Sequence, residues 1–177
     1  VVTLVSRMLR DKGIFEFAEA SRLLKQRGIH FRAVLVGTPD PENTTSIPAA
    51  QLEAWQAGGF VAWWGQKDDI PDVWSHSHIA VLPSDREGVP MSLIEAAACG
   101  RPVITTDVPG CREIVKHGKN GLLVPVKDPK ALADAICRFI ESPDLRRQMG
   151  QEGRELVEEE FAESVVVAQT LNLYQSI

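Results

Sequence analysis

Short apolar segments rich in β-branched residues alternate with longer segments of helical periodicity over the first 126 residues of the chain. The segments predicted to be strands are VVTLVS (1–6), FRAVLVG (31–37), FVAWWG (60–65), IAVLPS (79–84), PVITTD (102–107) and GLLVPV (121–126). The helical segments between them cover residues 14–28, 49–58, 70–77, 89–99 and 111–117. Continuous apolar strands that alternate with helices are typical of a parallel sheet covered on both faces. We therefore predict a three-layer α/β/α, Rossmann-like fold with a doubly wound parallel sheet of about six strands.

The strand pattern ends after residue 127, and three helices are expected over residues 128–142, 144–160 and 163–177. Asp128 followed by Pro129 is typical of a helix start, because Asp caps free amides and Pro suits the first helical position. No internal repeat or low-complexity linker interrupts the chain. We expect residues 1–177 to form one domain, of which residues 128–177 are the terminal helices.

The composition argues against several classes of protein. A net charge of −5 and a pI of about 5.4 argue against a general nucleic-acid-binding surface. The cysteines, Cys99, Cys111 and Cys137, are odd in number and form no CxxC, which indicates reduced thiols. No apolar run approaches the roughly 18 residues of a membrane span. The chain begins inside a predicted strand and without Met, so we expect it to be a piece of a longer polypeptide.

Charged residues follow the first and fourth predicted strands, in the stretches SRMLRDKG and SDREGVP. Six strands suggest the order 3-2-1-4-5-6, in which a crevice opens beyond the carboxyl ends of strands 1 and 4. If this order holds, Arg7 and Lys12 face Glu87 across one crevice. TPDPENTTSIP (38–48) is interpreted as a polar loop.

The stretch after strand 1 favours a diphosphate over other ligands of such sheets. It contains no GxGxxG, which a dinucleotide cofactor would need, and the chain contains no GxxxxGK[ST] phosphate loop. Arg7 and Lys12 supply two positive charges there instead. Gly88, Val89 and Pro90 lead into the helix predicted over 89–99, whose free amides also favour an anion. The two loops together predict a diphosphate site.

The two glutamates of this region predict contacts with hydroxyl groups. Glu95 lies in the otherwise apolar stretch LIEAAAC, where an unpaired charge would be costly. A carboxylate directed into a polar crevice accepts hydrogen bonds from neighbouring hydroxyls, such as those of a ribose. Glu87 is placed to do the same for a group beyond the phosphates. Cations for a diphosphate and carboxylates for hydroxyls together describe a nucleotide sugar.

Glu87 and Glu95 form the pattern E-x7-E, and the text around them resembles retaining glycosyltransferases of the GT-B fold, in glycosyltransferase group 1 (family 4). SRMLRDKG is similar to the family's GRL-x-x-x-KG, with Ser6 in place of the usual Gly, and AVLVG to its second strand. VAWWGQKDDIPDVWSHSHIAVLPS and EGVPMSLIEAAACGRPVITTDVPGCREIVKHGKNGLLVPVKDP resemble the segment that borders the base and the donor-site block. These motifs occur in the family's order and spacing.

The resemblance implies roles for individual residues. Arg7 and Lys12 would bind the donor diphosphate, Glu87 would contact the transferred sugar, and these three would form the catalytic set. Glu95 would contact the ribose, and the loop from Gly65 to Asp69 would border the base. The donor-binding residues implied in this way are Arg7, Lys12, Gly37, Gly65, Lys67, Glu87, Gly88, Val89, Pro90, Met91, Ser92 and Glu95.

The resemblance also implies what the chain does and lacks. It covers only the carboxyl-terminal, donor-binding half of a two-domain enzyme, so an amino-terminal acceptor domain would be absent and the chain alone would transfer little sugar.

No cofactor and no metal are expected. The expected partners are a UDP-, GDP- or ADP-linked sugar and an acceptor saccharide, free or lipid-linked, but no nucleic acid. The expected location is the cytoplasm, with peripheral association of the full-length protein at the inner face of the membrane as an option, in bacterial polysaccharide or glycoconjugate synthesis.

Two other functions remain open at this stage. Half of a nucleotide-sugar epimerase shares this architecture and would release an epimerised product without an acceptor. A non-catalytic module that binds nucleotide sugars is the other alternative.

Overall fold

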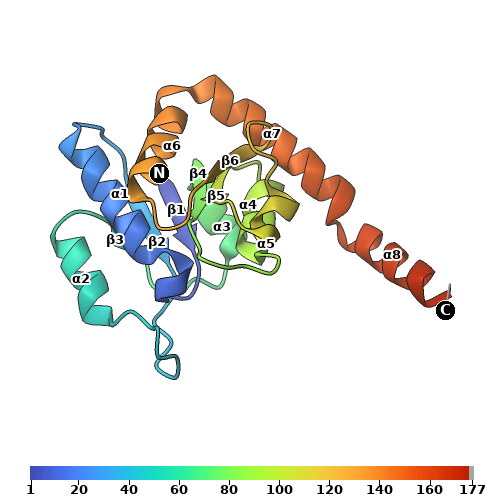
Figure 1. Cartoon of the computed structure of the whole chain (residues 1–177), viewed down its shortest axis with the longest axis horizontal. Helices are drawn as coiled ribbons and strands as arrows, with labels where there is room; N and C mark the ends of the chain where they lie inside the picture. Colours follow the sequence, from blue (N-terminus) through green and yellow to red (C-terminus); the bar gives the residue numbers. More distant parts are fainter. Residues whose placement is uncertain (176–177) are drawn as a thin grey trace.

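The sheet of this protein has the strand order that the sequence predicts. The computed structural model describes residues 1–175, and within them six parallel strands form one sheet in the order β3-β2-β1-β4-β5-β6 (Figure 1). The strands are β1 (Val2–Val5), β2 (Ala33–Val36), β3 (Ala62–Trp63), β4 (Ile79–Leu82), β5 (Val103–Thr106) and β6 (Gly121–Val124). The chain runs outward in one direction from β1 to β3 and in the other from β4 to β6. The order reverses between β1 and β4.

The register keeps the carboxyl ends of the central strands level. β1 pairs with β2 from Val2 opposite Ala33, and with β4 from Val2 opposite Ile79. These strands are apolar and buried on both faces, as parallel strands covered by helices must be. The loops that leave β1 and β4 therefore start side by side at one edge of the sheet.

Helices cover both faces of the sheet, which gives the three-layer, Rossmann-like fold (Figure 1). The helical elements are η1 (Arg10–Lys12), α1 (Ile14–Gln26), α2 (Ala49–Ala57), α3 (Ile70–Ser75), α4 (Met91–Ala98), α5 (Pro109–Ile114), α6 (Pro129–Glu141), α7 (Pro143–Glu160) and α8 (Glu163–Gln175). On one face α1 packs against α6, and on the other α4 packs against α7. Fully buried side chains such as Phe17 of α1 and Phe139 of α6 fill the space above the sheet.

The last helix differs from the others. None of the residues of α8 is buried, and Figure 1 shows it extending away from the sheet at the end of α7. Of the helix predicted over 163–177, residues 176–177 lie outside the described residues. In the part of the chain that the structure covers, no helix is at once long enough and apolar enough to cross a membrane.

Most predicted elements differ from the observed ones by a few residues at their ends, and two of these differences have a clear structural cause. The helix predicted over 111–117 begins at Pro109 and ends at Ile114. It ends there because the amide of Lys116 donates to Asn120 Oδ1 at 2.7 Å and the chain turns toward β6. The strand predicted over 60–65 is reduced to Ala62–Trp63, since it lies at the edge of the sheet and pairs only with β2.

The predicted start of the helix over 128–142 is confirmed. Asp128 is the N-cap of α6, its Oδ1 accepts a hydrogen bond from the amide of Ala131 at 2.8 Å, and a proline occupies the start of the helix. We expect Asp128→Ala to lower the free energy of unfolding by about 1 kcal/mol, because the capped amide loses its partner. Asp128→Asn keeps an acceptor oxygen and should lose less. Urea denaturation of both variants checks this, and equal losses would show that the cap bond contributes nothing.

Candidate functional site

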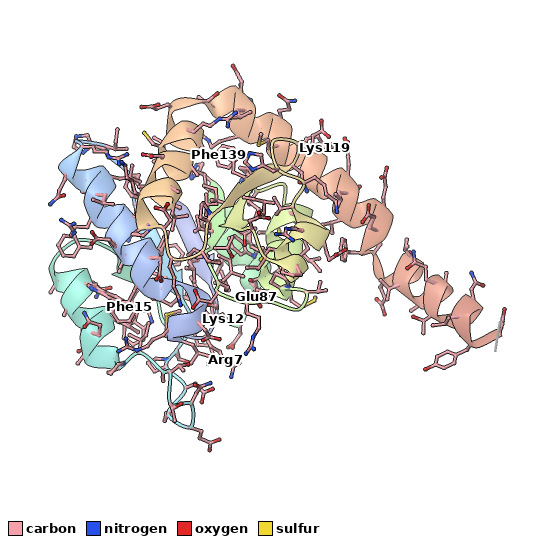
Figure 2. The ribbon with its side chains drawn as sticks, viewed as in Figure 1. Arg7, Lys12, Phe15, Glu87, Lys119 and Phe139 are labelled. Carbon is pink, nitrogen blue, oxygen red and sulfur yellow. The ribbon has the colours of Figure 1, made fainter. Side chains whose placement is uncertain are left out.

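A lysine from the first half of the sheet and a glutamate from the second meet at the carboxyl edge. Lys12 Nζ donates to Glu87 Oε1 at 2.7 Å, and only 19% and 9% of the two side chains are exposed. Lys12 ends η1, which follows β1, and Glu87 lies in the loop that follows β4. Figure 2 shows Arg7, Lys12 and Glu87 gathered at this edge. The structure thus brings Lys12 and Glu87 into direct contact rather than across a gap.

The loop that carries Glu87 is held by hydrogen bonds from three directions. Ser84 Oγ donates to the same Oε1 of Glu87 at 2.6 Å, and Thr106 Oγ1, at the end of β5, donates to the carbonyl of Ser84 at 2.5 Å. The amide of Asp85 donates to the carbonyl of Asp11 at 2.9 Å, which joins this loop to η1 by backbone alone. The carboxylate of Glu87 is therefore fixed before any ligand arrives.

Gly110 fixes the same loop by close backbone approach, and the sequence analysis did not identify it. A Cβ at this position would lie 1.6 Å from the carbonyl oxygen of Gly88 and 2.4 Å from that of Glu87. Only a residue without a side chain lets the first turn of α5 approach the 87–88 backbone so closely. The Pro-Gly pair that follows β5 at the same edge of the sheet was the available signal.

Arg7 lies beside the Lys12–Glu87 pair but has a different partner. Its Nη1 donates to Asp40 Oδ2 at 2.9 Å, and 64% of the Arg7 side chain is exposed. Both residues line a cavity of about 430 Å³ at the ends of β1 and β2, together with Gly37 and Lys67. Five of the expected residues are thus divided between a largely buried ion pair (Lys12 and Glu87) and an open cavity (Arg7, Gly37 and Lys67).

Asp40 is a further residue that the sequence analysis missed, because the loop 38–48 was interpreted only as polar. The structure binds this loop to the segment after β1: the amide of Ile47 donates to the carbonyl of Met8 at 2.8 Å, and that of Arg10 to the carbonyl of Thr45 at 2.9 Å. The loop is therefore a wall of the cavity. The acidic cluster DPE directly after the second strand was the signal for it.

Gly37 lines this cavity and is hydrogen-bonded to Gly65. Gly37 has a φ of 131°, and a Cβ there would lie 1.9 Å from the carbonyl oxygen of Ser6. Its amide donates to the carbonyl of Gly65 at 2.8 Å, and its carbonyl accepts from the indole Nε1 of Trp63 at the same distance. The ends of β1, β2 and β3 are thereby tied together. Ser6 Oγ donates a hydrogen bond to the carbonyl of Arg7 at 2.9 Å.

The amino end of α4 carries the rest of the expected residues. Pro90 is its N-cap, Val89 and Met91 are 50% and 62% exposed, and Gly88 and Ser92 flank them. The first amides of any helix lack partners inside it, so this turn offers donors to an anion. Glu95, one turn further along, is partly buried, and burial raises the pKa of its carboxyl.

Residues 1–175 contain no group of three or more His, Cys, Asp or Glu side chains arranged to hold a metal ion. Two of the cations at this edge of the sheet, Arg7 and Lys12, are each paired with a carboxylate. The arrangement therefore suits an anionic ligand that carries hydroxyl groups.

Comparison with known proteins assigns a family. The model of the family "Glycosyl transferases group 1" matches residues 1–156. An N,N'-diacetylbacillosaminyl-diphospho-undecaprenol alpha-1,3-N-acetylgalactosaminyltransferase of Campylobacter jejuni is 32% identical over 177 residues, which are all of this chain and 45% of that protein. The capsular polysaccharide biosynthesis glycosyltransferase CapM of Staphylococcus aureus is 29% identical over 176 residues, which are 99% of this chain and 46% of CapM. The chain spans about half the length of the curated relatives it matches.

Solved structures share the fold over nearly the whole chain. Sucrose-phosphate synthase from Thermosynechococcus elongatus is 32% identical, with a TM-score of 0.85, over 99% of this chain and 45% of that one. Anabaena HepE, solved in complex with UDP, has a TM-score of 0.88 at 24% identity, over 99% of this chain and 48% of that one. At that identity HepE shows the fold alone.

The contact at Gly110 is testable by substitution. We expect Gly110→Ala to lower the free energy of unfolding by about 3 kcal/mol, because its Cβ would overlap backbone atoms of residues 87 and 88. Gly88→Ala is the matched control, since a Cβ there meets no atom within 4 Å. Chemical denaturation measures both. Equal stability of the two variants would mean that the backbone of residues 87 and 88 moves away from the added Cβ without lowering the free energy of unfolding.

The raised pKa of Glu95 predicts a pH dependence. Because the pKa of Glu95 is higher in the folded than in the unfolded state, protonation of Glu95 stabilises the fold. This stabilisation is complete below about pH 4.3, the unperturbed pKa of a glutamate. It is lost as the pH rises through the folded-state pKa. Glu95→Gln removes the titrating group. The variant should therefore gain stability relative to the natural chain as the pH rises from 4 to 7. Urea denaturation across this range checks it, and a difference independent of pH would contradict it.

Proposed function

The chain belongs to the group 1 glycosyltransferases, and from this premise we propose that it is the donor-binding domain of a retaining enzyme that moves a sugar from a nucleotide diphosphate to an acceptor hydroxyl. The observation that carries the proposal is the Lys12–Glu87 contact of 2.7 Å where the strand order reverses, the position at which sheets of this type bind ligands. A cation and a carboxylate held together there match the phosphate and hydroxyl groups of one nucleotide sugar.

We assign the diphosphate to Lys12 and Arg7. An ammonium has three donors, of which Lys12 directs one at Glu87, so others remain for a phosphate oxygen. Arg7 uses Nη1 for Asp40, and its remaining guanidinium donors are free to form charge-assisted bonds with phosphate. The first amides of α4, from Gly88 to Ser92, would complete the cradle.

The two glutamates and the cavity would hold the remaining parts of the donor. Glu87 would accept hydrogen bonds from the transferred sugar and Glu95 from the ribose. The cavity lined by Arg7, Gly37 and Lys67 has room for the nucleoside, and Gly65 is hydrogen-bonded to Gly37 beside it. Its volume of about 430 Å³ falls within the range of roughly 300 to 1,000 Å³ usual for ligand sites.

In the proposed reaction, negative charge develops on the departing diphosphate while the sugar becomes oxocarbenium-like. Lys12, Arg7 and the amino end of α4 would stabilise that charge by preorganised electrostatics, without a divalent metal or another cofactor. Retention of configuration without an enzymatic nucleophile favours attack from the face that the diphosphate leaves. A phosphate oxygen of the donor would then accept the proton of the acceptor.

We propose that the longer protein uses a UDP-, GDP- or ADP-linked sugar and a saccharide acceptor, free or lipid-linked, in polysaccharide or glycoconjugate synthesis. The C. jejuni relative is named for a diphospho-undecaprenol substrate and the S. aureus relative for capsular polysaccharide biosynthesis, which supports this class. The proposed location is the cytoplasm, at the inner face of the membrane. Both of these relatives are named as glycosyltransferases or as a transferase of a named sugar, which favours transfer over epimerisation or ligand binding alone.

The acceptor would be held by a further, amino-terminal domain. We therefore propose that these 177 residues bind the donor but transfer little sugar on their own. A transfer assay that compares this chain with its full-length protein tests the point, and equal rates would contradict it.

The assignment of the cations predicts their effect on affinity. We expect Lys12→Ala and Arg7→Ala each to weaken the binding of the preferred nucleoside diphosphate by about 1.5–3 kcal/mol, the value of a hydrogen bond to a charged group. A thermal-shift screen of UDP-, GDP- and ADP-sugars identifies the ligand, and calorimetry measures its affinity.

Lys130→Ala is the matched control, because Lys130 is exposed at the start of α6 and makes no ion pair in the part of the chain described. It should leave the affinity unchanged. If none of the nucleotides binds the natural chain, or if Lys12→Ala and Arg7→Ala both bind like Lys130→Ala, the proposed donor site is wrong.

A further inference from the structure

A second cavity lies between α1, α2 and the start of α6, and the proposed donor site does not use it. Its volume is about 400 Å³, and aromatic side chains line it from two helices and the turn after α2: Phe15, Trp55 and Phe60. Phe15 and Trp55 fix one another edge to face, with ring centres 5.0 Å apart at 87°. Figure 2 shows Phe15 on the side of the molecule that carries α2, beyond Lys12. We call this the aromatic cavity.

The charges around the aromatic cavity balance. Glu16, Glu19, Arg22 and Lys127 line it. Arg22 binds Glu19 through two hydrogen bonds of 2.7 and 2.6 Å, and this pairing lowers the pKa of the Glu19 carboxyl. The carboxylate of Glu16, in contrast, makes no hydrogen bond or ion pair within residues 1–175. One acceptor group thus remains available in a cavity without excess charge.

Lys127 connects the aromatic cavity with the Glu87 loop. Its Nζ lies 3.1 Å from Asp85 Oδ2, two residues before Glu87. Lys127 is also the one non-glycine residue with a positive φ, 58°, among the residues described. A side chain is held in this strained conformation where the surrounding structure requires it, and such residues cluster at ligand sites. Lys127, which lines the cavity, thus contacts the loop that carries Glu87.

The geometry points to a binding site for a neutral saccharide unit in the aromatic cavity, adjacent to the donor site and sharing none of its residues. A sugar ring has apolar C–H faces, which aromatic rings cover, and hydroxyls at its rim, which a free carboxylate such as Glu16 accepts. The inference rests on the proposed function in one respect: the ligand would be a unit of the acceptor or product saccharide away from the reacting hydroxyl.

A nucleotide does not fit this cavity on electrostatic grounds. Its phosphates would meet the carboxylate of Glu16, which no cation pairs with in the described residues. A fully apolar ligand would leave the Glu16 carboxylate desolvated without a partner, which is unfavourable. A polyhydroxylated, uncharged ligand satisfies both the rings and the carboxylate.

The test uses nuclear magnetic resonance of the indole N–H groups. Maltose, cellobiose and N,N'-diacetylchitobiose are titrated separately into the chain, and UDP is titrated as the ligand of the proposed donor site. We expect at least one disaccharide to shift the Trp55 indole signal saturably and to leave that of Trp63, beside the Arg7 cavity, unchanged. UDP should not compete with it.

Two matched variants test the role of Glu16. Glu16→Gln keeps the shape but loses the charge-assisted hydrogen bonds, so the disaccharide should bind about fivefold more weakly. Glu53→Gln changes an exposed glutamate of α2 that does not line the cavity, and it should bind like the natural chain. If the two variants bind alike, the inference is wrong.

The two proposals fail separately in this experiment. If UDP binds but none of the three disaccharides shifts Trp55 up to its solubility limit, the saccharide site is wrong and the donor site stands. If a disaccharide binds as expected but UDP and the other nucleotides do not, the donor site is wrong and the aromatic cavity remains a saccharide site.

Discussion

The ion pair between Lys12 and Glu87 joins the two halves of the sheet, and the arrangement of the candidate site depends on it. The pair is short, largely shielded from water, and formed by loops that are 75 residues apart in the chain. It exists because β1 and β4 are neighbours, which follows from the reversal of strand order between them. A parallel sheet wound in a single direction would have separated these loops by the width of other strands.

Contacts of the backbone as well as of side chains hold the Glu87 loop in place. The Asp85–Asp11 bond ties it to η1, Thr106 ties it to β5, and α5 touches it at Gly110. A carboxylate with little freedom to move loses little entropy when a ligand binds, so this rigidity favours the proposed role of Glu87. The residues that support the site are thus as important for its geometry as those that would touch the donor.

The sequence predicted the sheet, its strand order and the loops that form the site, because the apolar periodicity and the topology rules act over long segments. It did not predict Asp40 or Gly110. Their roles arise from contacts between loops distant in the chain, which periodicity does not record. The bounds of α5 and β3 were wrong for a related reason: the side chain of Asn120 ends the first, and the edge position limits the second.

The lining of the Arg7 cavity has a consequence for redesign. Gly37 lines it and is tied to Gly65 and Trp63 at the ends of three strands, whereas other lining residues come from the loop 38–48 and from Gln66 and Lys67. Lys12 and Glu87 do not line this cavity, so we expect substitutions of Gln66, or of residues 38–48 other than Asp40, which binds Arg7, to leave their ion pair in place. The shape of the cavity, and with it the choice of ligand, can therefore be altered while the Lys12–Glu87 ion pair is kept.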